Sequence, residues 1–328
     1  MKAVSIMEFL NSGDKQIFLN KNNLLIITAG STYLDIDAYA CAVAMAELLN
    51  LQGITAIAYS EAPFNYSVCN SLVEDTHIMR SLPDGVSVEN ANYIIVDVSD
   101  PEFLSCSLPL EQVVEVYDHH VGFEKYWANR IGDGAHIEFI GAAATLIYRE
   151  WKSAKLADKM SRSTALLLIA AILDNTLNLT STNTTDEDIM VFNELCKKEN
   201  ITSEWCSSYF FEVQENIEAD LKNAIFNDIK SVGDNDILPS KVAQLCVWDV
   251  EKIILRLLEI RDMFSNITDS WMINIIDLQH SCSYFVCDSI VHQKKLEDVF
   301  DIKFEFGVAK TSKSYLRKEI IKKTLFNK

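Results

Sequence analysis

The sequence contains little proline and glycine and little positive charge. Its 328 residues include five prolines and ten glycines, and 29 Lys and Arg residues stand against 47 Asp and Glu residues, for a formal net charge of −18. So few chain breakers, together with 49% hydrophobic residues, exclude a disordered or fibrous chain and favour a globular α/β protein. The negative charge argues against general nucleic-acid binding and against attachment to anionic membranes.

Long apolar segments and paired cysteines are missing too. The longest apolar run, residues 165–173, is too short to cross a bilayer. The first residues lack the apolar core and cleavage site of a secretion signal. The eight cysteines show no Cys-x-x-Cys spacing and mostly lie in apolar patterns, as reduced thiols do. We therefore expect a cytoplasmic protein that makes no membrane contact.

Short apolar runs alternate with helical patterns in the first two thirds of the chain. The strand-like runs are residues 24–29, 55–59, 93–96 and 113–117. The helical patterns are residues 37–50, 141–151, 185–198 and 204–229. Continuous apolar strands that alternate with helices predict a parallel sheet covered by helices on both faces.

The length of the chain favours two domains, which we expect at residues 1–212 and 213–328. The second part is again α/β and smaller. Its strand-like runs are residues 242–247, 271–276 and 284–287, with a helix expected at 250–264.

Acidic residues and histidines follow four of the apolar segments. They are Asp35 and Asp37, Asp97, the triplet Asp118-His119-His120, and Asp174 after residues 166–173. One such aspartate alone is more often a helix cap. Strand ends in a parallel sheet meet at one edge, so these side chains are expected to converge.

Carboxylates with imidazole suit divalent metals. Mn²⁺ and Mg²⁺ favour carboxylate oxygen, and imidazole adds affinity for transition metals, with Co²⁺ as a third candidate. Two metals about 3.5–4 Å apart need a bridging ligand, for which Asp97 is our candidate.

In order and spacing, these four motifs resemble those of the DHH phosphoesterase superfamily. In the second half, Asp220-Leu-Lys222 and Leu316-Arg317-Lys318 are similar to segments of the DHHA2 domain. The resemblance covers essentially the whole chain. It implies a DHH metal-binding catalytic domain, a DHHA2 substrate-binding domain and an active site in the cleft between them. The DHHA2 group includes exopolyphosphatases, prune-like phosphoesterases and family II inorganic pyrophosphatases.

The resemblance also implies residue roles. Asp35 and Asp97 would hold one divalent metal, and Asp37, Asp97, His119 and Asp174 the other. Asp118 would orient a histidine, and His120 would donate a hydrogen bond to substrate phosphate. Lys222, Arg317 and Lys318 would contact phosphate oxygens, although a solvated basic tail is the alternative interpretation for the last two. The implied reaction is in-line attack on phosphorus by a water whose pKa the metals lower.

One departure from the family pattern bears on the substrate. Pyrophosphatases of the family have a histidine four residues before the first motif aspartate, where this chain has Ser31. Exopolyphosphatases and prune-like relatives also lack it, so the resemblance favours an exopolyphosphatase that releases terminal phosphate from polyphosphate.

Three alternatives remain open at this point. The chain could be a manganese-dependent inorganic pyrophosphatase, or a phosphodiesterase that acts on cyclic nucleotides or oligonucleotides. It could also be a degenerate DHH protein that binds without turnover. The partner in any case is polyphosphate, pyrophosphate or another small phosphate compound, and the protein is expected to be a monomer or a homodimer.

Overall fold

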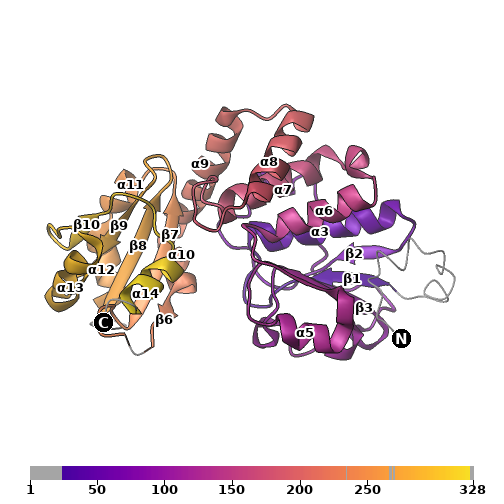
Figure 1. Cartoon of the computed structure of the whole chain (residues 1–328), viewed down its shortest axis with the longest axis horizontal. Coiled ribbons are helices and arrows are strands. Elements are labelled where there is room, and N and C mark those ends of the chain that lie inside the picture. The colour runs from indigo at the N-terminus through magenta and orange to yellow at the C-terminus, as the bar shows by residue number, and fades with distance from the viewer. Residues whose placement is uncertain (1–23, 234, 266–267, 269, 326–328) are drawn as a thin grey trace. The chain divides into compact units, whose positions relative to one another are not determined.

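Figure 1 shows the computed structural model, which describes residues 24–328 apart from 234, 266–267, 269 and 326–328. The chain divides into two compact units, Met1–Ser203 and Glu204–Lys328. The division that we expected after residue 212 falls inside helix α9 (Ser203–Ala219). Because the helix runs unbroken through residue 212, no loop-forming residues in the sequence indicate where one unit ends and the next begins.

The first unit is built on a parallel sheet with the strand order β2-β1-β3-β4-β5. Its strands are β1 (Leu25–Thr28), β2 (Ala56–Ala58), β3 (Asn92–Val96), β4 (Val113–Asp118) and β5 (Ala135–Ile137). Every neighbouring pair runs parallel, which confirms the predicted sheet. Strand β5 was not among the predicted strands.

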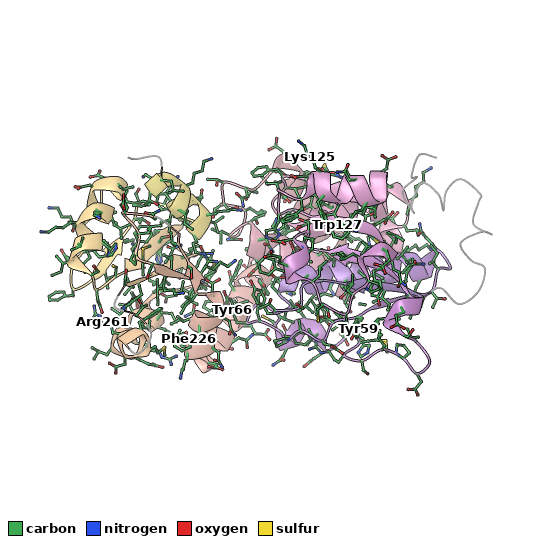
Figure 2. All side chains as sticks on the ribbon, turned by 90° about the horizontal axis from the view of Figure 1, so that it is seen from below. Tyr59, Tyr66, Lys125, Trp127, Phe226 and Arg261 are labelled. Carbon is green, nitrogen blue, oxygen red and sulfur yellow. The ribbon has the colours of Figure 1, made fainter. Side chains whose placement is uncertain are left out.

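Helices cover both faces of this sheet. The helices of the first unit are α3 (Ile36–Leu51), α4 (Asn70–Val73), α5 (Glu124–Ile131), α6 (Ala143–Ser153), α7 (Arg162–Asn175) and α8 (Asp186–Glu199). Helices α3 and α6 lie over one face and α5 over the other (Figure 1). Trp127 of α5, labelled in Figure 2, is fully buried against Ile26, Ile95 and Val116 of the strands.

Residues 166–173 form part of helix α7 and not the strand end that we expected before Asp174. A short apolar run has the same composition in a buried strand and in a helix that is buried all round. Here the Ser161 hydroxyl caps the helix by accepting a hydrogen bond from the Thr164 amide. Helix α7 contacts α3, α6 and α8, which accounts for its apolar residues.

The second unit has a mixed sheet with the order β10-β9-β8-β7-β6. Its strands are β6 (Lys230–Ser231), β7 (Lys241–Val247), β8 (Trp271–Asp277), β9 (Cys282–Val286) and β10 (Val308–Lys310). Strands β7 and β8 are parallel and the other pairs antiparallel. All seven residues of β8 are buried, so both faces of the sheet are covered at its centre.

The helices of the second unit are shorter than expected. Besides α9, they are α10 (Leu221–Asp228), α11 (Glu251–Ile254), α12 (Leu257–Ser265), α13 (Ile290–Phe300) and α14 (Arg317–Leu325). The helix predicted at residues 204–229 is divided because Asp220 leaves helical geometry and caps α10. No helix in the described part of the chain has the length and apolar character needed to span a membrane.

Candidate metal centre

The parallel sheet gathers acidic side chains at the ends of its strands. Asp97 follows β3, Asp118 ends β4, and Asp35 and Asp37 stand at the start of α3. The charges of Asp35, Asp37 and Asp118 all act on Asp97. We call these four residues the acidic cluster, and the structure brings them together as the sequence indicated.

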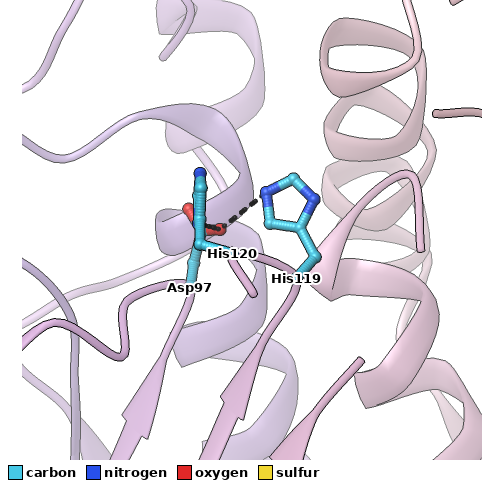
Figure 3. A group of neighbouring side chains, drawn as sticks. All are labelled: Asp97, His119 and His120. Carbon is cyan, nitrogen blue, oxygen red and sulfur yellow. Dashed lines mark ion pairs between the residues drawn. The ribbon is translucent and has the colours of Figure 1, made fainter. Parts of the chain in front are cut away.

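Asp97, His119 and His120 form a group of possible metal ligands in the described residues, with ligand atoms within 4.8 Å of one another (Figure 3). His119 Nε2 lies 3.4 Å from Asp97 Oδ1, and both side chains are buried. The Asp97 backbone has a φ of 57°, a left-handed conformation that costs on the order of 1–3 kcal/mol. Its amide donates to the Tyr117 carbonyl oxygen at 2.8 Å, which holds the strained turn in place.

The ring orientation of His119 follows from its other nitrogen. Nδ1 lies 3.3 Å from the Ile140 carbonyl oxygen. A carbonyl oxygen only accepts, so Nδ1 carries the proton and Nε2 faces Asp97 Oδ1. Two electron-rich atoms 3.4 Å apart require a cation or a proton between them. A divalent metal about 2.0–2.2 Å from each atom fits this spacing.

Asp118 holds His120 in a fixed position. Its Oδ1 accepts from the His120 amide at 3.0 Å and lies 2.9 Å from His120 Nδ1. Burial acts to raise the pKa of Asp118, but the hydrogen bonds from His120 outweigh it and the pKa is lowered. Burial likewise acts to lower the pKa of His120, and Asp118 reverses that effect. The His120 side chain remains 65% exposed.

Asp37 is fully buried, and hydrogen bonds from peptide groups offset only part of the cost of burying its negative charge. Its two oxygens accept hydrogen bonds of 2.8 Å from the amides of Ala143 and Ala144, at the first turn of α6. The Cys41 thiol donates to Oδ1 at 3.3 Å. Burial and the charge of Asp35 nevertheless raise the pKa of Asp37 to about 7.

Asp97 has the same imbalance. Burial, followed by the charges of Asp37, Asp35 and Asp118, raises the pKa of Asp97 well above its usual range. Asp97 Oδ1 is buried and accepts no hydrogen bond from the described residues. Buried carboxylates whose strongest charged neighbours are other carboxylates form a site that a cation would stabilise. The donor set therefore fits divalent metal.

Two of the predicted ligands are less directly placed. Asp35 caps α3 by accepting from the Ala38 amide at 3.0 Å, and it acts electrostatically on both Asp37 and Asp97. Asp174 stands near the end of α7 and is not among the groups that most strongly affect the pKa of Asp37 or Asp97. Its role as a ligand stays a prediction.

Ser31 is engaged in fixing the loop before Asp35. Its amide and hydroxyl both donate to the Phe103 carbonyl oxygen, at 2.8 and 3.0 Å. Ser31 thus links two loops. It stands at the position where pyrophosphatases of the family that this chain resembles carry a histidine.

The predicted phosphate contacts lie in the second unit. Arg317 begins α14, and its guanidinium donates to the side chain and carbonyl oxygen of Asp228. Lys222 lies on α10 with its Nζ 5.6 Å from the centroid of the Phe226 ring. Burial lowers the pKa of Lys318. Arg317 therefore already has a carboxylate partner, and contact of these residues with phosphate stays a prediction.

Several contributors could not be found from sequence. The amides of Ala143 and Ala144 leave no signature in residue type. Asp188 of α8 is fully buried and accepts from the Gly141 amide at 2.9 Å and from the Thr145 hydroxyl, which ties the segment before α6 to α8. A Cβ at Gly141 would lie 2.5 Å from Asp188 Oδ2, so only glycine fits. The small residues of this segment serve close packing.

Comparisons with known proteins bear on the fold. No protein-family model matches the sequence, and no curated protein matches it. Among solved structures, the Methanococcus jannaschii protein described as "putative family II inorganic pyrophosphatase" is similar with a TM-score of 0.63 and 17% identity, over 92% of this chain and 99% of that one. A Bacteroides fragilis exopolyphosphatase-related protein has a TM-score of 0.49 and 11% identity, over 96% of this chain and 94% of that one.

The similarity to the archaeal structure extends over nearly the whole of both chains. It spans the parallel sheet that presents the acidic cluster and the mixed sheet beyond it. The predicted α/β fold with a parallel sheet is thus confirmed.

Proposed function

We propose that this protein is a metal-dependent phosphohydrolase that cleaves phosphoanhydride bonds. The observation that carries the proposal is the pair formed by His119 Nε2 and Asp97 Oδ1, which face each other at 3.4 Å inside a group of buried carboxylates. Bound divalent metals would offset the cluster's negative charge, draw phosphate oxygens to it and lower the pKa of a water.

The ligands that we assign follow the family pattern on this chain. Asp35 and Asp97 would hold one metal, and Asp37, Asp97, His119 and Asp174 the other. The described geometry supports Asp97 as the shared ligand, because its carboxylate faces the His119 ring and the charges of Asp37, Asp35 and Asp118 all act on it. Mn²⁺, Mg²⁺ and Co²⁺ are the candidate ions for such oxygen-rich sites.

His120 is suited to bind a phosphate oxygen. Asp118 holds its Nδ1 and raises its pKa, so the exposed ring favours the protonated form that donates a hydrogen bond. Lys222, Arg317 and Lys318 would supply further positive charge to the substrate. Asp228 already orients the Arg317 guanidinium before any phosphate binds, which reduces the conformational entropy lost on binding.

Inorganic polyphosphate is the first substrate to consider. Ser31 cannot replace imidazole as a strong metal ligand, and its hydroxyl is engaged with the Phe103 carbonyl oxygen. This supports a first metal site that is weaker than in pyrophosphatases and an exopolyphosphatase activity. Pyrophosphate hydrolysis is the alternative within the same chemistry. A binding protein without turnover is the alternative outside it.

A metal-restoration assay tests the proposal. Metal-stripped protein would be supplied with Mg²⁺, Mn²⁺ or Co²⁺ and offered pyrophosphate, tripolyphosphate, long polyphosphate and cyclic AMP. We expect release of phosphate from tripolyphosphate and long polyphosphate only after a metal is restored. Fast cleavage of pyrophosphate would show that Ser31 suffices. Silence with every substrate and metal, although calorimetry detects metal binding, would favour the binding protein.

A further inference from the structure

Three polar side chains stand on one face of the second sheet. Gln244 of β7 lies directly opposite Asn274 of the neighbouring strand β8. Ser283 of β9 lies opposite Ile276, two residues further along β8. Residues two apart in a strand point to the same face, so Gln244, Asn274 and Ser283 share one face, and we call them the polar row. Asn274 and Ser283 are fully buried.

The polar row holds the chain segment that leads into α14, which packs against β7 (Figure 1). Ser283 Oγ accepts a hydrogen bond of 2.9 Å from the Tyr315 amide. Asn274 Nδ2 donates to the Tyr315 carbonyl oxygen at 2.6 Å. Gln244 Oε1 accepts from the Arg317 amide at 2.6 Å and from Asn274 Nδ2 at 3.3 Å. Three neighbouring strands thus fix the backbone where α14 begins.

Gln244 also bonds to the partner of the Arg317 side chain. Its amide donates to Asp228 Oδ2 at 2.6 Å, and the same carboxylate accepts from the Arg317 guanidinium. One glutamine therefore contacts both members of this ion pair. Only 13% of the Arg317 side chain is exposed, so its reach to a ligand depends on accurate placement of its backbone.

Stability alone does not account for the asparagine in this row. Asn274 Oδ1 is buried and has no hydrogen-bond partner among the described residues, and burial of such a group is unfavourable. The neighbouring residues of β8 are apolar: Met272, Ile273, Ile275 and Ile276. A further apolar side chain would fill the same space without the penalty. The hydrogen bonds of Asn274 to the segment before α14 supply the missing reason.

We propose that Gln244 and Asn274 are positioning residues for a contact between Arg317 and substrate phosphate. This inference rests on the proposed function and, within it, on the role of Arg317. The two residues act on the protein and not on the substrate. They fix the backbone and the guanidinium of Arg317 before phosphate arrives, which reduces the conformational entropy lost on binding.

The test measures KM for tripolyphosphate and the Kd of inorganic phosphate, both with the full-length, Mn²⁺-loaded protein. Gln244→Met and Asn274→Leu remove the hydrogen bonds and roughly keep the side-chain volume. We expect each variant to raise KM and Kd about three- to tenfold, the loss of one well-placed contact, and to change kcat little. Gln244 is only partly buried, so Gln244→Met carries the test if Asn274→Leu does not fold.

Coupling to Arg317 separates positioning from a general loss of structure. In the Arg317→Ala background, Gln244→Met should raise KM by less than about twofold, because the contact that Gln244 positions is already gone. Effects of the two substitutions that simply multiply would overturn the inference. So would a Gln244→Met protein whose KM and Kd equal those of the unaltered protein.

Thr324→Val is the matched control in the same helix. Thr324 is 1% exposed, and its hydroxyl accepts a hydrogen bond of 2.9 Å from Asn235 Nδ2. Valine keeps the shape and removes this bond, so the urea midpoint should fall while KM and Kd stay unchanged. An equal rise in KM would show that any weakening of α14 affects substrate affinity, and would contradict a specific role for the polar row.

The outcomes also separate this inference from the proposed function. If Gln244→Met leaves KM and Kd unchanged while phosphate release still depends on metal, the inference fails and the phosphohydrolase proposal stands. The same conclusion follows if Arg317→Ala changes neither constant, since no contact is then positioned. If the metal-loaded protein neither cleaves tripolyphosphate nor binds inorganic phosphate, both proposals fail.

Discussion

The two units contain nearly the same local arrangement at the end of a strand. Asp118 ends β4 and binds the amide and Nδ1 of His120, at 3.0 and 2.9 Å. Asp277 ends β8 and binds the amide and Nδ1 of His280, at 2.9 and 3.1 Å. Both aspartates are buried, and the histidine side chains are 65% and 55% exposed.

Their surroundings differ because the sheets differ. In the parallel sheet, Asp118 has Asp97 at the end of the neighbouring strand, and Asp35 and Asp37 beyond it. In the mixed sheet, the neighbours of Asp277 are Val247 at the end of the parallel strand β7 and Cys282 at the start of the antiparallel strand β9, and neither is acidic. The compact group of possible ligands found among the described residues is in the first unit. The pairing of an aspartate with a histidine at a strand end is therefore a local structural unit, and the acidic residues around Asp118 make its copy in the first unit a candidate metal centre.

The strongest test of this contrast is Asp97→Asn. Loss of the shared carboxylate should lower phosphate release from tripolyphosphate with Mn²⁺ by more than about 100-fold, since even indirect supports of a metal ligand cost about 10–100-fold. His119→Ala should have a similar effect. His280→Ala, in the second unit, is the control and should retain activity. Substantial turnover by the Asp97→Asn variant would show that Asp97 is not a ligand of the metal centre.

The crowded carboxylates should also affect how the free energy of unfolding of the metal-stripped protein depends on pH. Asp37 has a pKa of about 7 in the folded protein and about 3.9 when unfolded, so between these values the folded state binds more protons. Stability of the metal-stripped protein should therefore fall as the pH rises from about 4 to about 7, by roughly 3 kcal/mol or more. Urea unfolding at pH 5 and pH 7.5 measures the effect.

Two controls isolate the cause of this pH dependence. Asp37→Asn should reduce the slope of the stability curve, with Asp97 still contributing to it, whereas Asp277→Asn should leave the slope unchanged. Added Mn²⁺ should restore stability at the higher pH. A metal-stripped protein that gains stability across this range would contradict the assigned burial of negative charge.

The paired variants Asp118→Asn and Asp277→Asn sharpen the comparison directly. Asp118→Asn should lower kcat or Mn²⁺ affinity by about 10–100-fold, because the orientation and protonation of His120 depend on this carboxylate. Asp277→Asn should cost about 1–3 kcal/mol of stability with activity retained. Equal effects of the two variants on activity would show that the arrangement has one role in both units.

The smallest expected effect is on substrate affinity. Arg317→Ala should raise KM about five- to tenfold, through loss of a charge-assisted contact with phosphate, and change kcat little. It should also lower stability, because Asp228 loses its cation and burial already raises the pKa of that carboxyl. Arg256→Ala, which removes a surface arginine paired with Glu259, is the control. An unchanged KM would leave Arg317 a purely structural residue.

Sequence indicated most of the candidate centre, because Asp97, Asp118 and the histidines follow β-branched runs that form strands of a parallel sheet. The strand expected before Asp174 was wrong, since a helix buried all round leaves no periodic pattern. The partner of Arg317 was not foreseen, because Asp228 lies 89 residues away and no spacing links them. Contacts between distant segments depend on how elements pack, which residue order alone does not express.

The bonds from Asp37 to the first turn of α6 have a consequence for recognising relatives of this protein. Both donors are peptide N–H groups, at Ala143 and Ala144, and every amino acid except proline supplies one. The contacts themselves therefore do not depend on which side chains stand at these two positions, although both alanines are buried and packing limits their size. Part of the site therefore depends on backbone conformation, and homologues that share this conformation can show little similarity when their amino-acid sequences are aligned.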